Sequence, residues 1–232
     1  MEKEEHRSLF RKKNMVEERM LIFECMKNGS LSDHLHGPST SSSSSYSPVV
    51  SAWKTRIEIL LGVSRAIEYL HSYAVPPVIH RDIKSSNILL DSSWSPRLSG
   101  FDVAIGCFGE AECGEISIST SVVGGTRGYL DPGYLCTGQV RPASDVYSFG
   151  IVMLEVLSGR RTILQSKEEH GDGDGDGDGP MDLVSHTLPL IDAGQVLHVL
   201  DRRPAEEPTP RQLEAADLVA RTAALPAREW GE

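Results

Sequence analysis

The chain has 232 residues, of which 39% are hydrophobic and 24% charged, enough for one large domain with a buried core. Its formal net charge of −10 and the lack of a basic stripe argue against nucleic acid as a partner. No apolar run is long enough to cross a bilayer, and the four cysteines show no paired spacing, so we expect a cytoplasmic chain with reduced thiols and no membrane segment.

The first third of the chain predicts a strand, a short helix, a loop and a long helix. The apolar run at residues 19–26 is typical of a buried strand. Ser30 is placed to cap a short helix over residues 31–37. The serine-rich tract at 38–48 predicts a solvated loop. Apolar residues at three- and four-residue steps then predict a long helix from Ser51 to about Tyr73.

Short strands and a long loop follow in the middle of the chain. The segments VIH, NILL and PRLS, at 78–80, 87–90 and 96–99, each read as a short strand bounded by polar turns. Residues 106–140 are rich in Gly, Ser and Thr and predict a long loop, which in a compact domain is usually functional.

The last part of the chain predicts three helices. Residues 145–159 are apolar nearly all round, so we expect a central buried helix that ends at Gly159. The Gly/Asp repeat at 167–180 predicts a linker. An amphipathic piece follows at about 181–193, and a further helix opens after Thr209 with Pro210 in its first position.

One polar loop has the composition of a catalytic site. The segment VIHRDIKSSNILL places a carboxylate at Asp82, a cation at Lys84 and an amide at Asn87 between two strand pieces. This set suits phosphoryl transfer: Asp82 would accept a hydroxyl proton, Lys84 would offset phosphate charge and Asn87 would hold a metal. The alternative is a polar loop that only joins two strands.

The segment resembles the catalytic loop of the protein kinases, with His80-Arg81-Asp82 followed by Lys84 and Asn87 in register. Lys84 at this spacing is similar to the serine/threonine class. The resemblance implies ATP and Mg²⁺ as cofactors and a protein substrate or partner kinase as partner.

Further segments extend the resemblance over about 18–219. GGTRGYLDP resembles the substrate-docking segment, where Thr126 would touch Asp82 and Lys84, and Asp145 would brace the catalytic loop with Arg81 beside it.

ERMLIFECMKNGSLSDHLH resembles the fifth strand and hinge, with Phe23 as gatekeeper and the backbone of Glu24 and Met26 as adenine contacts. The amino-acid sequences of these segments resemble those of plant receptor-like kinases, including the crinkly-type branch. Such a domain would lie at the cytoplasmic face of the plasma membrane if it belonged to a longer receptor.

The resemblance implies an α+β protein-kinase-like fold, made mainly of an α-helical C-lobe. Residues 1–18 would be an N-lobe remnant or disordered, 19–28 the N-lobe strand and hinge, and 29–232 the C-lobe. Within the C-lobe, residues 100–135 would form the activation segment.

Several positions depart from the kinase pattern. The residues before the hinge contain no glycine, so we expect no phosphate-covering loop, and the N-lobe lysine and glutamate are expected to be absent. Gly100-Phe101-Asp102 stands where the family carries Asp-Phe-Gly, so the metal-binding carboxylate is expected to be lost, with Asp102 a doubtful substitute. Gly133 stands where the family carries a glutamate that pairs with a late arginine.

Two functions follow from these matches and departures. One is a serine/threonine kinase domain, impaired or inactive in this chain; the alternative is a pseudokinase or fragment that acts as a protein-binding module. Arg81 could meet a phosphate in the activation segment. The candidate phosphorylation residues there, with an ordinary polar loop as the alternative, are Ser117, Ser119, Thr120 and Ser121.

Overall fold

The computed structural model describes residues 22–37, 47–107, 116–163, 181–204 and 208–228, with side chains described up to residue 224. The predicted remnant at 1–18, most of the serine-rich tract and the whole 167–180 linker lie outside these residues. None of the helices in the described part of the chain is both long and apolar enough to cross a membrane.

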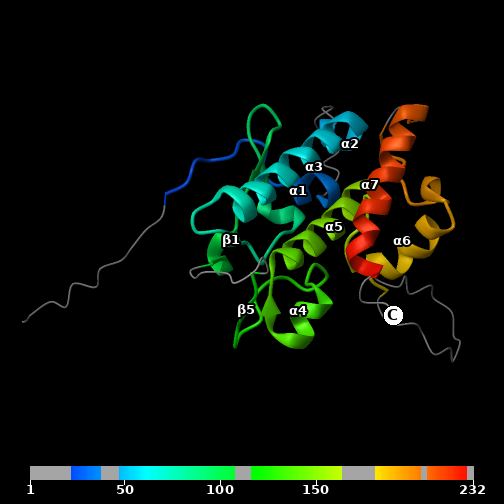
Figure 1. Ribbon diagram of the computed structural model, residues 1–232. Coiled ribbons are helices and arrows are strands. Elements are labelled where there is room, and N and C mark those ends of the chain that lie inside the picture. Colours follow the sequence, from blue (N-terminus) through cyan, green and yellow to red (C-terminus); the bar gives the residue numbers. More distant parts are fainter. Residues whose placement is uncertain (1–21, 38–46, 108–115, 164–180, 205–207, 229–232) are drawn as a thin grey trace, which may run out of the picture.

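The fold is mainly α-helical, as expected for a kinase C-lobe (Figure 1). The helices are α1 (Leu31–His36), α2 (Pro48–Ser51), α3 (Trp53–Glu68), α4 (Pro132–Thr137), α5 (Pro142–Ser158), α6 (Leu183–Asp192) and α7 (Pro210–Arg228). The strands are β1 (Val78–Ile79), β2 (Ile88–Leu90), β3 (Pro96–Leu98), β4 (Ile105–Gly106), β5 (Ile118–Ser119) and β6 (Gln139–Val140). They pair antiparallel as β1–β4, β2–β3 and β5–β6.

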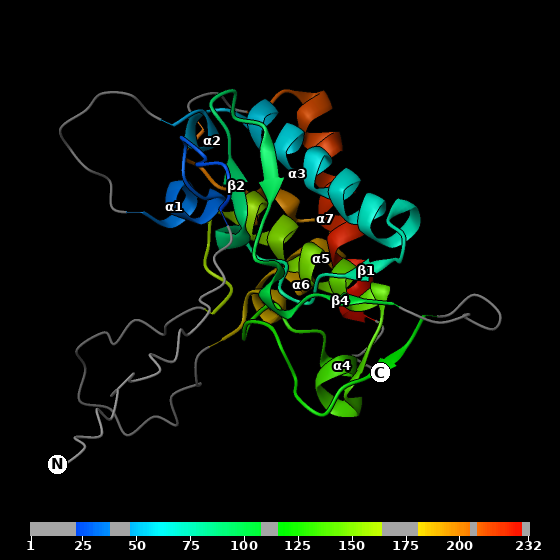
Figure 2. The same ribbon diagram turned by 90° about the vertical axis from the view of Figure 1, so that its left-hand side faces the viewer.

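Helix α5 is the centre of the fold. Most of its residues are buried, and it packs against α3, α6 and α7, as both ribbon views show (Figures 1 and 2). Gly159 ends the helix at φ = 65°, a left-handed conformation that glycine adopts without steric cost. The prediction of a central buried helix is confirmed.

The long helix predicted from Ser51 is present as α3 and the π-helical turn that follows it, and the extended residue Ala52 separates α3 from α2. α2 ends at Ser51, α3 continues to Glu68, and a π-helical turn covers Tyr69–Tyr73. The buried residues of α3 recur with the predicted three- and four-residue steps: Trp53, Arg56, Ile59, Leu60, Val63 and Ile67.

The helix caps predicted from the sequence are also present. Ser30 caps α1, and its hydroxyl accepts a hydrogen bond from the Asp33 backbone, whose side chain accepts one in return from Ser30. Thr209 and Gln212 form the same reciprocal arrangement at the start of α7.

Two predictions about the irregular parts are wrong. Residues 22–26, the described part of the predicted strand 19–26, have no regular secondary structure, because no described strand lies beside them to pair with. The predicted loop 106–140 contains α4 between β5 and β6. Asp131 caps α4 and Pro132 occupies its first turn, where a missing N–H costs nothing.

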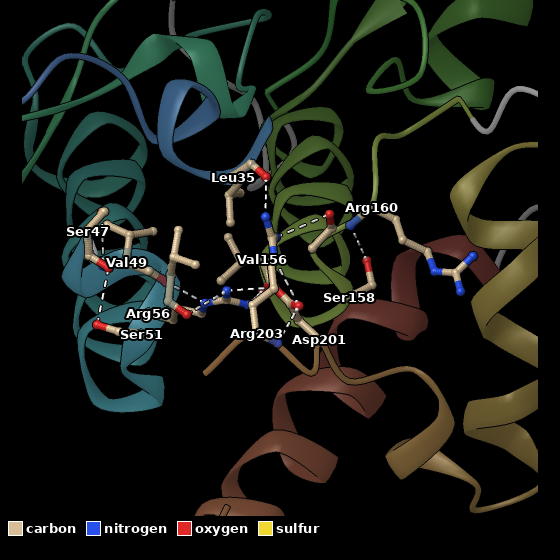
Figure 3. Close-up of polar contacts among 12 residues, drawn as sticks. Leu35, Ser47, Val49, Ser51, Arg56, Val156, Ser158, Arg160, Asp201 and Arg203 are labelled. Carbon is tan, nitrogen blue, oxygen red and sulfur yellow. Dashed lines mark hydrogen bonds and ion pairs between the residues drawn. The ribbon is translucent and has the colours of Figure 1, made fainter. Parts of the chain in front are cut away.

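A buried charge network joins the first helices to the end of α5 (Figure 3). Arg56 is 0% exposed, and its guanidinium donates to the carbonyls of Val49, at 2.6 Å, and Val156, at 2.8 Å. It also pairs with the Asp201 carboxylate at 2.7 Å, which Arg203 contacts from the solvent side. The network therefore links α2, α3, α5 and the segment before α7.

Candidate active site

The candidate site lies on the segment between β1 and β2. His80 and Ile83 are fully buried and anchor the segment in the fold. Asp82, Lys84 and Asn87 alternate with the anchors and are half-buried. Because buried and polar residues alternate, one short and anchored loop carries all three functional side chains.

Asp145 supports the turn that precedes Asp82. The Asp145 carboxylate, 1% exposed in the first turn of α5, accepts hydrogen bonds from the backbone N–H groups of His80 and Arg81, both at 2.8 Å. His71 lies at 2.8 Å from the same carboxylate. Arg81 has φ = 71°, a conformation unfavourable for a residue with a Cβ. The two backbone hydrogen bonds hold this strained turn in place.

The four residues predicted to meet at the catalytic loop form one hydrogen-bonded cluster. Lys84 Nζ lies 2.9 Å from Asp82 Oδ2 and donates to Thr126 Oγ1 at 2.7 Å. Thr126 in turn donates to Asp82 Oδ1 at 2.6 Å. Asn87 Nδ2 donates to both Asp82 Oδ2, at 2.9 Å, and the Asp82 carbonyl, at 2.8 Å.

These contacts set the charge of the Asp82 carboxylate. Burial raises its pKa, but the hydrogen bonds from Thr126, Lys84 and Asn87 outweigh burial and leave the pKa below its ordinary value. Asp82 is therefore ionised at neutral pH, with a cation beside it. Such a pair can orient a hydroxyl group and balance negative charge close to it.

His80 ties the loop to the segment that follows β3. Its Nε2 donates to the Ser99 carbonyl at 2.9 Å, and its Nδ1 accepts from the Asp82 backbone N–H at 3.2 Å. Burial lowers the pKa of His80, which agrees with the neutral ring that these two bonds require. The ring also lies 4.6 Å from that of Phe101.

A second buried network, which the sequence analysis did not identify, supports the docking segment. The Glu155 carboxylate, 2% exposed, accepts hydrogen bonds from Tyr129, at 2.7 Å, and Ser85, at 2.9 Å, and pairs with His36 at 2.7 Å. The network joins α1, the catalytic loop, the docking segment and α5. The only sequence signal was a glutamate inside an otherwise apolar helix.

The segment at Gly100-Phe101-Asp102 is not extended. Gly100 adopts φ = 81°, and Phe101–Val103 form a 3₁₀ turn. Asp102 is exposed, and its carboxylate makes no hydrogen bond or ion pair with any residue in the described ranges.

The residues at this place do not fit a magnesium site of the kinase kind. A hard divalent cation needs several oxygen ligands, usually with at least one carboxylate. Position 100 offers no carboxylate and Asp102 is turned out to solvent. Of the predicted ligands this leaves only the side-chain oxygen of Asn87, whose NH₂ group donates to Asp82. Within the described part of the chain, no group of three or more His, Cys, Asp or Glu side chains could hold a metal ion.

The predicted hinge residues are at the surface. Phe23 is 79% exposed, Glu24 is exposed and Met26 is half-buried. The gatekeeper role of Phe23 and the adenine contacts of Glu24 and Met26 stay predictions, because the described residues place no element over them.

The four candidate phosphorylation residues lie in or beside β5: Ser117, Ser119, Thr120 and Ser121. Arg81, their predicted partner, already donates to the carbonyls of Val103, at 3.0 Å, and Val122, at 2.9 Å, and to the Tyr134 hydroxyl. Thr120 Oγ1 lies 3.4 Å from that hydroxyl. Thr120 thus comes within hydrogen-bonding distance of the group that Arg81 contacts.

The fold and the catalytic-loop cluster are those of a protein kinase, and the chain belongs to this family. The protein kinase domain family matches residues 2–182. The predicted resemblance to plant receptor-like kinases is confirmed.

The individual relatives are plant proteins. The chain is 43% identical to the serine/threonine-protein kinase-like protein CCR4 of Arabidopsis thaliana over 90% of its length, and 42% identical to the putative serine/threonine-protein kinase-like protein CCR3 of the same plant over 89%. It is 46% identical over 65% of its length to the probable serine/threonine-protein kinase PBL23. The chain spans 25% of CCR4, 25% of CCR3 and 37% of PBL23.

Proposed function

We propose that this chain is a serine/threonine kinase domain of plant receptor-like type in which phosphoryl transfer is impaired, so that it acts mainly by binding other proteins. The observation that carries the proposal is Gly100, which leaves the site without the carboxylate that the family uses to bind metal. The exposed position of Asp102 supports the same conclusion, since a solvent-facing carboxylate outside the cluster is a poor substitute.

The intact part of the site favours a binding role. Asp82, Lys84 and Thr126 satisfy one another through hydrogen bonds of 2.6 to 2.9 Å. Asp145 and Glu155 support the loop and the docking segment from below. Side chains that are already fixed lose little conformational entropy when a partner binds. This surface is therefore pre-organised for a protein segment that carries a hydroxyl group.

The incomplete part of the site disfavours catalysis. Positioning and electrostatic stabilisation carry nearly all of the acceleration in phosphoryl transfer, so the loss of one charged component is costly. Asp82 and Lys84 could still orient a hydroxyl group and offset charge beside it. The second candidate function is therefore an active kinase, which the intact cluster of Asp82, Lys84 and Thr126 favours.

Phosphate incorporation tests the proposal. The purified chain and its Asp82→Ala variant would be incubated with Mg-ATP and a generic serine/threonine substrate, and labelled phosphate would be measured in both proteins. We expect the two to be indistinguishable. Incorporation by the unaltered chain well above the Asp82→Ala level would instead favour the active kinase.

A further inference from the structure

Two pairs of adjacent arginines meet at the C-terminal end of α5. Arg160 and Arg161 follow Gly159 directly. Arg202 and Arg203 lie in the segment before α7, and the Arg203 guanidinium donates to the Gly159 carbonyl at 3.4 Å, which brings the second pair beside the first. All four arginines are exposed. The fold thus gathers four cations on one surface, here called the arginine patch, although the net charge of the chain is −10.

Two of these guanidinium groups are held at the end of α1. Arg203 Nη1 donates to the Leu35 carbonyl at 2.7 Å, a contact drawn in Figure 3. Arg161 Nη2 donates to the His36 carbonyl at 3.3 Å. Because these carbonyls belong to successive residues, the two cations lie close together. Arg161 makes no other side-chain hydrogen bond within the described ranges, so most of its N–H groups are open to a ligand.

The carboxylates packed against these segments do not neutralise the patch. One oxygen of Asp201 lies 2.7 Å from both Arg56 and Arg203, so a single negative charge is shared by two cations. Glu155 is buried and engaged inside the fold. Asp182 caps the start of α6, where its side chain accepts a backbone hydrogen bond. An excess of positive charge therefore remains at this surface.

The other two arginines have no partner in the part of the chain that the structure describes. The side chains of Arg160 and Arg202 make no hydrogen bond or ion pair there. In Figure 3 the Arg160 side chain extends away from the Asp201 network. Burial lowers the pKa of His186, and the charge of Arg160 lowers it further, as expected where the local potential is positive.

The arginine patch adjoins the docking segment. A Cβ atom added to Gly128 would come 2.6 Å from Thr162 Oγ1, so the docking segment is in direct contact with the residue that follows Arg161. A partner segment that crosses the docking segment therefore reaches the patch.

We propose that the arginine patch binds a phosphorylated serine or threonine of the partner protein. A phosphoryl group carries a charge of about −1.5 to −2 at neutral pH and offers three strong acceptor oxygens. The planar guanidinium of arginine donates to such oxygens in pairs, which the point charge of lysine does not. The inference rests on the proposed function, because it names the class of partner for the binding role. It requires neither metal nor nucleotide.

A binding assay with the full chain tests the proposal. The probe is a short fluorescent Gly/Ala peptide that carries phosphoserines, compared with the same peptide carrying unmodified serines, and anisotropy is measured without Mg-ATP. The test variant combines Arg161→Gln with Arg202→Gln. The matched control combines Arg65→Gln with Arg211→Gln, which removes the same charge from exposed positions on α3 and α7.

The phosphorylated peptide should bind to the unaltered chain, and raised salt should weaken the binding. The test variant should bind it at least several-fold more weakly, while the control binds as the unaltered chain does. Equal melting temperatures of the two variants would show that the loss is local. The unmodified peptide should not bind to any of them.

Equal binding by the test and control variants, or equal binding of the two peptides, would overturn the inference. It would also be overturned if the unaltered chain bound neither peptide. Binding that appeared only after the carboxylates at 168–178 were replaced by amides would assign the patch to the chain's own acidic run instead of to a partner. Because the assay contains no nucleotide, its failure is distinct from a failure of the phosphate-incorporation test.

Discussion

Removal of the Asp201 charge should destabilise the domain strongly. Arg56 is fully buried, and Asp201 supplies its counter-charge at 2.7 Å, so Asp201→Asn would leave a buried cation without a carboxylate (Figure 3). Breaking such a pair from one side typically costs about 3–5 kcal/mol. For a domain of this size each kcal/mol lowers the melting temperature by roughly 2–4 °C, so we expect a loss of about 6–20 °C.

Two further variants distinguish the contribution of the buried Arg56–Asp201 pair to stability from that of the more exposed Arg203. Arg203→Gln removes the half-exposed partner of Asp201 and should cost about 1 kcal/mol, since exposed ion pairs contribute little. Combining Asp201→Asn with Arg56→Met should recover much of the loss, because an apolar residue in place of a buried charge is often tolerated.

Acid sensitivity gives an independent check of the same pair. Burial raises the pKa of Asp201, but the hydrogen bonds from Arg203 and Arg56 outweigh it and leave the pKa below its ordinary value. A lowered pKa in the folded state means that this stability is complete above the unfolded-state pKa of about 4 and is lost as pH falls through the folded-state pKa.

Urea unfolding, followed by circular dichroism at several pH values, measures both effects. Below about pH 4, the free energy of unfolding should fall less steeply with decreasing pH in Asp201→Asn than in the unaltered chain. An Asp201→Asn variant within about 1 kcal/mol of the unaltered chain at pH 7 would refute the importance of this pair.

Three other outcomes follow from the described contacts. Tyr129→Phe removes one hydrogen bond to the buried Glu155 and should lower the free energy of unfolding by about 1–3 kcal/mol in urea titrations; no change would argue against the network. Gly159→Ala places a Cβ 2.3 Å from Asp201 Oδ2 and should lower the melting temperature measurably; an unchanged value would contradict that contact. Phe23→Ser should leave the melting temperature unchanged, because Phe23 is 79% exposed; a clear loss of stability would contradict that exposed position.

The regular elements could be predicted because their signals are local. α5 is apolar over most of its length, and the start of α7 is marked by Thr209 and Pro210. The catalytic-loop residues could be placed together because one short segment carries three of them. The short helix α4 was missed although Asp131 and Pro132 mark its start, because its six residues are too few to show periodicity.

The supporting networks could not be predicted because they join distant residues. Arg56 and Asp201 are 145 positions apart, and His36 and Glu155 are 119 apart. A single charged residue on an amphipathic helix gives no indication of its partner. The strand predicted at 19–26 is absent from its described residues, 22–26. A strand needs a neighbouring strand to pair with, and the local sequence does not show whether one is present.

The central claim is that the loss of the carboxylate at position 100 impairs phosphoryl transfer, and a chimaera tests it most directly. The complete N-lobe of a related active kinase would be joined to this chain at the hinge, and phosphate transfer measured with and without the pair Gly100→Asp and Asp102→Gly, each against an Asp82→Ala control. We predict transfer above the control only in the chimaera that carries both substitutions. Equal transfer with Gly100 and Asp102 unchanged would contradict the claim and show that the chain retains a working site.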